Sequence, residues 1–191
     1  MTPFEFVFFL YALMLSLALT HLVGGWALAL RHAGQIRWST PHVTWAVTAL
    51  FTTTGNLASF WMMRDAPTWN AWLVLSNFAF ALVNYIWCVF ITPEVERDGT
   101  LDLVAFHDVK RRQYLLPYVL LASLAIVGNV VNGMFATYDN WLGDSVFSAV
   151  SLSAAIVAIQ SSRRRVQLVT GMVSLAGATW FIIAASNIIG H

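Results

Sequence analysis

The stretch FVFFLYALMLSLALTHLVGGWALAL, from Phe6 to Leu30, decides the class of fold. A helix needs about 20 apolar residues to cross the hydrocarbon core of a bilayer, and this stretch exceeds that length. His21 is its single ionisable side chain, and Arg31 ends it. It is too long for the apolar part of a signal peptide, and no basic residue precedes it. We therefore predict a retained membrane-spanning helix.

Five further apolar stretches of similar length follow. We predict membrane spans over residues 6–30, 43–63, 69–91, 114–135, 142–160 and 166–189. The chain has 191 residues, so the connections are too short for a separate soluble domain. Only 10% of the residues are charged and 59% are hydrophobic, whereas an average soluble domain carries about 25% charged residues. The predicted fold is an all-α polytopic membrane helix bundle, a single transmembrane domain over residues 1–191.

The basic residues are distributed asymmetrically. Nine of the ten Lys and Arg residues lie in the connections after the first, third and fifth spans: Arg31, Arg37, Arg97, Lys110, Arg111, Arg112, Arg163, Arg164 and Arg165. Connections rich in Lys and Arg stay in the cytoplasm. We therefore predict that these three connections are cytoplasmic and that both termini lie outside. The net charge of +1 gives no indication of a nucleic-acid partner.

One connection, residues 92–113, is longer than the others. Pro93 and Asp98-Gly99 predict a turn in its first half. Asp102 is a suitable N-cap for a short helix from Leu103 to Arg112. Leu103 and Phe106 recur at helical spacing among charged residues, so we expect a short amphipathic helix on the cytoplasmic surface that leads into the fourth span.

Polar side chains inside the predicted spans are the first candidates for a site, because each needs a partner away from water. The candidate intramembrane polar site is His21, Asn56, Asn77, Asn84, Asn129 and Asn132. Two interpretations stay open. The residues line a pathway for a proton or a small solute, or they form hydrogen bonds that join the helices.

Two basic clusters flank predicted cytoplasmic span ends. They are Lys110, Arg111 and Arg112, and Arg163, Arg164 and Arg165. Besides setting the topology, they are candidate contacts for an anionic lipid or a partner protein, since basic residues near an anionic leaflet are attracted to it. Small residues at close-packing spacing, such as Gly171 and Gly24, mark contacts within the chain or between subunits of a homo-oligomer.

The sequence offers no catalytic residues and no metal or cofactor site. It lacks a nucleophile motif and a glycine-rich phosphate loop, and Cys88 is a lone cysteine that we expect to be buried. A haem held by two histidines is not expected, because four of the five histidines are predicted to lie in loops or at the tail: His32, His42, His107 and His191. The densest group of acids and histidine is predicted on a solvated face: Asp98, Asp102, His107 and Asp108.

Several stretches carry a resemblance. They are Phe4-Glu5-Phe6 through Tyr11 to His21-Leu22-Val23-Gly24-Gly25, Ser59-Phe60-Trp61, and Thr92-Pro93 with Asp102-Leu103 and Lys110-Arg111-Arg112. Together they resemble small proteobacterial membrane proteins of several spans that have no established activity. The resemblance implies a bacterial inner-membrane location and transfers no functional residues.

Three hypotheses about function follow. The first is a non-enzymatic scaffold, accessory subunit or sensor that works through helix packing and its basic face. The second is a small channel or transporter lined by the intramembrane polar residues. The third is an enzyme that modifies lipid at the interface, using Asp102, His107 and Asp108.

Overall fold

The computed structural model describes residues 2–61, 63–64, 69–94, 100–135 and 141–189, with the backbone alone over 132–135 and 185–189. Within these residues the chain forms six α-helices. They are α1 (Pro3–Arg31), α2 (Thr40–Trp61), α3 (Ala71–Ile91), α4 (Leu103–Phe135), α5 (Trp141–Gln160) and α6 (Arg164–Ile189). Each coincides with one predicted span to within a few residues, except that α4 begins earlier.

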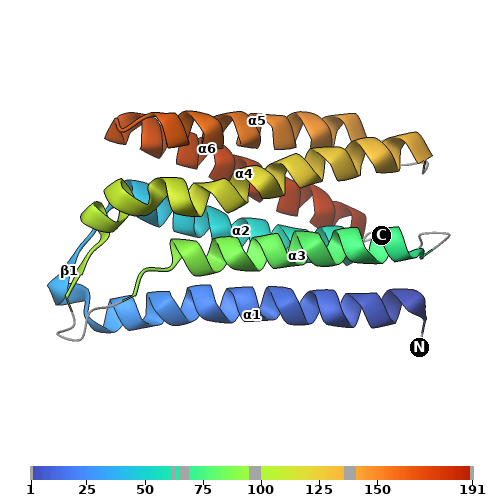
Figure 1. Cartoon of the computed structure of the whole chain (residues 1–191), viewed down its shortest axis with the longest axis horizontal. Helices are drawn as coiled ribbons and strands as arrows, with labels where there is room; N and C mark the ends of the chain where they lie inside the picture. Colours follow the sequence, from blue (N-terminus) through green and yellow to red (C-terminus); the bar gives the residue numbers. More distant parts are fainter. Residues whose placement is uncertain (1, 62, 65–68, 95–99, 136–140, 190–191) are drawn as a thin grey trace.

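The six helices run up and down along one common direction (Figure 1). The connections from α1 to α2, α3 to α4 and α5 to α6 lie at one end, and the start of α1 and the end of α6 lie at the other. We call the first end the basic end, because the described basic residues other than Arg64 lie in or beside its connections. The connections after the first, third and fifth helices therefore lie together at one end of the bundle, as the sequence predicts.

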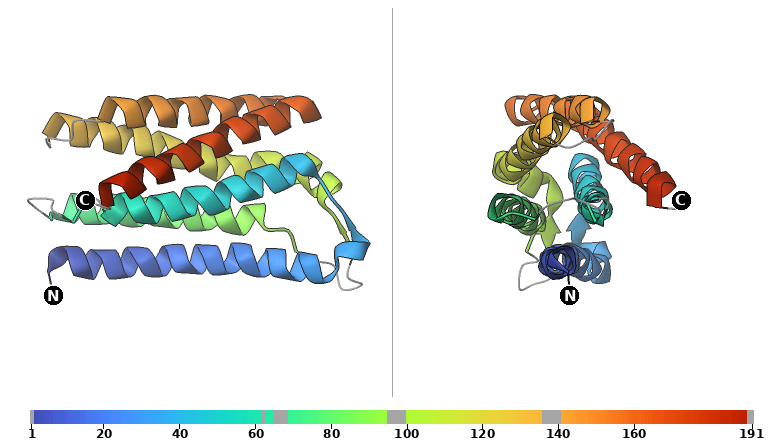
Figure 2. Two further views of the ribbon diagram at one scale, coloured as in Figure 1. Left: turned by 180° about the vertical axis from the view of Figure 1, so that it is seen from behind. Right: turned by 90° about the vertical axis from the view of Figure 1, so that its right-hand side faces the viewer.

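Helix α2 lies inside the bundle and touches α1, α3, α4 and α6. The end-on view shows α1 and α5 at opposite edges with α2 between them (Figure 2). The other five helices are long and apolar enough to cross a membrane, which indicates a multi-pass membrane protein. The polar composition of α2 fits its central position, because a helix covered by its neighbours need not present an apolar surface to lipid.

The core is centred on aromatic side chains. Trp45 of α2 and Trp87 of α3 are fully buried. Both rings pack on Tyr118 of α4, with Trp87 stacked at a centroid distance of 4.3 Å and Trp45 edge-on at 5.6 Å. Three helices are thereby joined at one level of the bundle.

Helix α4 differs from the prediction. The expected short helix, Leu103 to Arg112, is not a separate element on the surface but the first turns of a continuous helix that extends to Phe135. Leu103 and His107 are buried against the bundle, so this segment packs as part of it. Pro117, near the start of the predicted span 114–135, consequently lies inside the helix.

Some of the small residues bring helices into close contact. A Cβ atom on Gly25 would clash with Cγ2 of Thr92 at the end of α3, whereas one on Gly24 would meet nothing within 4 Å. Gly171 likewise admits Thr44 and Trp45 of α2. Gly25 and Gly171 therefore serve packing within the chain.

Candidate functional site

The basic end has its own ordered structure. After the short turn Ala33–Gln35, strand β1 (Ile36–Arg37) pairs in parallel with β2 (Leu101–Asp102). Ile36 and Leu101 are buried together with Ala29 and Leu103 beneath this pair. The connection that follows α1 is thus attached to the one that precedes α4.

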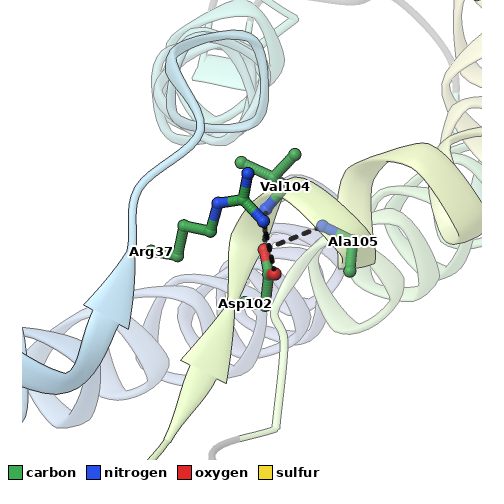
Figure 3. Close-up of polar contacts among 4 residues, drawn as sticks. All are labelled: Arg37, Asp102, Val104 and Ala105. Atoms are coloured by element: carbon green, nitrogen blue, oxygen red, sulfur yellow. Dashed lines mark hydrogen bonds and ion pairs between the residues drawn. The ribbon is translucent and has the colours of Figure 1, made fainter.

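Arg37 and Asp102 form an ion pair across the two strands, with Nη1 of Arg37 donating to Oδ2 of Asp102 at 3.3 Å (Figure 3). Oδ1 of Asp102 accepts from the backbone N–H groups of Ala105 and Val104, both at 2.9 Å. The predicted N-cap is therefore confirmed. The N–H of Ala105 contributes most to a pKa of Asp102 below its ordinary value of 3.8, and Val104 and Arg37 act in the same direction.

Two histidines lie buried behind this cap. His42, in the first turn of α2, and His107 of α4 are each 2% exposed, and their ring centroids are 6.4 Å apart. Oη of Tyr114 is hydrogen-bonded to Nδ1 of His107 at 2.6 Å, and Phe106 packs edge-on against His42. The prediction that both histidines lie in solvated loops is wrong, because each stands on a helix face that turns into the bundle.

The sequence contained a signal for this cluster. Leu103, His107 and Tyr114 are spaced by four and seven residues, which places them on one face of a continuous helix. Reading the segment as a short surface helix concealed that relation. Nothing in the sequence indicated that α2 would bring His42 against the same face.

Gln167 of α6 completes the cluster. Its side chain is buried next to His107, and Nε2 donates to the backbone carbonyls of Ala158 and Ser161 at the end of α5. Oε1 of Gln167 and Nε2 of His107 have no hydrogen-bond partner of normal geometry, but the two side chains lie close enough to interact with each other. Gln167 therefore holds the connection between α5 and α6 through its amide nitrogen and interacts with His107 of α4.

A second polar group lies further inside the bundle. Nδ2 of Asn84 donates to Oγ1 of Thr53 at 2.9 Å, and Nδ2 of Asn56 donates to Oδ1 of Asn84 at 3.1 Å. Oγ1 of Thr53 also lies 3.4 Å from Sγ of Cys88, which is buried as expected. Tyr11 of α1 donates to the backbone carbonyl of Asn56. This network joins α1, α2 and α3.

The other predicted polar residues lie apart from this network. His21 is exposed on the outer side of α1. Asn77 donates to the carbonyl of Leu73 in its own helix, and Asn129 is half-buried on α4. The side chain of Asn132 lies outside the described residues. Of the six candidates, the structure brings Asn56 and Asn84 together.

The two basic clusters lie at the same end of the bundle, at the starts of α4 and α6. Five of the six side chains are exposed: Lys110, Arg112, Arg163, Arg164 and Arg165. Arg111 is half-buried, and Arg111 and Arg164 are both close enough to His107 to act on it electrostatically. The clusters predicted from sequence thus flank the buried cluster that was not predicted.

Comparison with protein-family models, with curated proteins and with solved structures found no match to the chain. In the described part of the chain, no group of three or more His, Cys, Asp and Glu residues is placed to hold a metal ion. What the site can do chemically follows from its donors. It presents guanidinium and imidazole groups at the basic end, and amide and hydroxyl groups that pair with one another inside.

Proposed function

We propose that the chain is a six-span protein of the bacterial cytoplasmic membrane, with both termini outside, and that it acts as a non-enzymatic scaffold or accessory subunit. The observation that carries the proposal is the network of Asn84, Asn56 and Thr53. Groups that a pathway would expose to its solute are here used to join helices. A rigid bundle with apolar outer faces is suited to holding partner helices.

Six spans are supported by the position of α2. It has 22 residues, enough at about 1.5 Å per residue to cross the hydrocarbon core, and it runs alongside five helices that are apolar enough to do so. Its polar side chains find partners inside the bundle. Thr48, for example, donates to the carbonyl of Thr44 in the preceding turn at 2.9 Å.

The sidedness is supported by the basic end. Arg31, Arg37 and the two basic clusters lie there, and the positive-inside rule places such an end in the cytoplasm. Cysteine labelling tests this in a Cys88→Ser background, which keeps a partner for Thr53. An impermeant maleimide added to spheroplasts is expected to label Ala71→Cys at once and Ser162→Cys only after permeabilisation. The reverse order would overturn the orientation.

The scaffold role is tested by purification from native membranes in polymer nanodiscs, followed by mass spectrometry. We expect a reproducible membrane-protein partner, and its recovery should fall when side chains on the apolar outer faces of the bundle are substituted. Proton and cation flux into liposomes is measured in parallel for wild type, His21→Ala and Asn84→Ala. Flux equal to that of empty liposomes is expected for all three. Flux in the wild type that Asn84→Ala abolishes would replace the scaffold role with a transport pathway.

A further inference from the structure

Within the described residues, helix α1 has one side that no other helix covers. It lies at the edge of the bundle and packs on α2 and α3, and its buried residues lie on the side that faces them (Figure 2). On the opposite side, exposed residues recur at intervals of three and four: Leu13, Leu17, Thr20, Gly24 and Ala27. We call this row the outer stripe. Its spacing is the one at which two helices pack side by side along a shared seam.

The middle of the outer stripe allows a close approach. Ser16, Thr20 and Gly24 are exposed at intervals of four residues, with Ser16 beside the stripe and the other two in it. Small residues at this spacing let the backbones of two membrane helices come together. A Cβ atom on Gly24 would meet nothing within 4 Å, whereas the space beside Gly25 is already filled by Thr92 of the same chain. Gly24 therefore offers a close approach that this chain does not use itself.

His21 adds a polar group that needs a partner. It is exposed and lies four residues from the midpoint of Pro3–Arg31, about 6 Å along the helix axis, so it faces the middle of the bilayer. In the described part of the chain, the side chains of Ser16, Thr20 and His21 make no hydrogen bond. Exposed hydroxyls on other helices, those of Thr54 and Ser153, donate to carbonyls of their own helix. An imidazole facing hydrocarbon is costly, which indicates a partner from outside the chain.

Polar complementarity and depth select a second copy of this chain as the partner. A neutral imidazole carries one hydrogen-bond donor and one acceptor, and a hydroxyl can act as either, so identical surfaces can satisfy each other. Any partner must present its polar groups at the depth of Thr20 and His21. A copy inserted in the same orientation does so necessarily, because a two-fold axis along the membrane normal keeps each residue at its own depth. The position of α1 at the edge of the bundle leaves the approach open (Figure 2).

We propose that the chain forms a parallel homodimer through the outer stripe of α1. Gly24 packs against the partner's Gly24, and His21 is hydrogen-bonded to polar side chains of the partner. The proposal requires α1 to cross a membrane, for which it is long and apolar enough. It goes beyond the scaffold role, which concerns binding to other proteins.

Cysteine cross-linking in native membranes tests the contact. In a Cys88→Ser background, Gly24→Cys should form a covalent dimer on oxidation with copper phenanthroline, and Ser153→Cys should not. Ser153 is the matched control, because it is also exposed within a long apolar helix, on α5 at the opposite edge of the bundle. In an antiparallel pair the two cysteines at residue 24 would lie about 20 Å apart along the axis, so their cross-link also requires the proposed orientation.

Dilution in liposomes tests the affinity with purified protein alone, so the result does not depend on the scaffold role. Energy transfer between fluorescently labelled copies reports the dimer as the ratio of lipid to protein is raised. Gly24→Leu should weaken dimerisation at least tenfold by separating the backbones, and His21→Leu about threefold by removing an interhelical hydrogen bond. Gly128→Leu on α4 is the control for the glycine, because a Cβ atom there also meets nothing within 4 Å, and it should dimerise like the wild type.

Several results would overturn the proposal. Equal cross-linking of Gly24→Cys and Ser153→Cys would reduce the contact to random collision. A wild-type protein that is monomeric at every dilution, or a Gly24→Leu variant that dimerises as well as the wild type, would exclude the outer stripe as a dimer interface. A cross-link from residue 24 to a different protein and none to a second copy would assign the stripe to another partner. Circular dichroism checks that each variant is folded.

Discussion

Asn84 of α3 both donates to Thr53 and accepts from Asn56, two residues that lie nearly one turn apart on α2. Asn84 is fully buried, so its amide has no access to water. One side chain thus fixes the register between two helices, since sliding either by a turn would break both bonds and leave the amides of Asn84 and Asn56 without these partners.

Removing this amide should destabilise the bundle. Asn84→Ala leaves Asn56 and Thr53 each without one partner and opens a small cavity, so we expect a loss of about 1–3 kcal/mol in the free energy of unfolding. In a double-mutant cycle, Asn84→Ala and Asn56→Ala should couple by roughly 0.6 kcal/mol, a typical value for hydrogen bonds between membrane helices. Titration with sodium dodecyl sulfate, followed by circular dichroism, measures both quantities.

Asn77→Ala is the control for this experiment, because Asn77 bonds only to a carbonyl of its own helix. Its effect should be small and additive with Asn84→Ala. Strong coupling between Asn77 and Asn84 would contradict the assignment of separate roles.

The helices themselves could be predicted from sequence because each apolar run is a local property. Helix α4 shows the limit of that reasoning. The apolar run begins near Tyr114, but the helix begins at Leu103, since Asp102 caps it and β2 holds the cap in place. The extension depends on pairing with Ile36 and Arg37, far away in the chain, which no local pattern contains.

The candidate site shows a second limit. Spacing identified the asparagines and the basic clusters as polar features of the right helices. It could not identify partners, because whether Asn84 meets Asn56 and whether His42 meets His107 depends on how the helices pack. His21 is the clearest case, since a histidine in the middle of an apolar run is equally compatible with the inner and the outer side of the helix.

Gly25 and Gly24 provide a matched pair for the packing of α1 on α3. Alanine at residue 25 would place Cβ against Cγ2 of Thr92, which cannot turn away without breaking the bond from its Oγ1 to the carbonyl of Cys88. We expect Gly25→Ala to cost about 1–3 kcal/mol through overpacking. Gly24→Ala should be neutral or stabilising, because the site is open and alanine favours the helix by up to about 1 kcal/mol. Equal midpoints of thermal unfolding for the two variants would contradict the close contact.

The lowered pKa of Asp102 predicts that the stability of the basic end depends on pH. Its pKa is lower in the folded chain than the ordinary 3.8, so the folded state favours the ionised carboxylate. The resulting stabilisation is fully present above the ordinary value and is lost as the pH falls through the lower, folded value. The protection of the Val104 and Ala105 amides against hydrogen exchange, relative to the intrinsic exchange rate at the same pH, should therefore fall in acid. Asp102→Asn keeps a capping oxygen but should remove this dependence, and an unchanged acid response in that variant would assign it to another group.

Gln167 predicts how the end of α5 is held. Its amide is the donor to the carbonyls of Ala158 and Ser161, and an ionised glutamate offers acceptors alone. Gln167→Met should lower the free energy of unfolding by about 1–3 kcal/mol, because buried carbonyls lose their donor. Gln167→Glu should cost more at pH 7, since a carboxylate would face those carbonyls.

Gln160→Met changes an exposed glutamine at the end of α5 and should have little effect. If the methionine variant at residue 167 unfolded like this control under sodium dodecyl sulfate, the connection would be held by packing rather than by the amide.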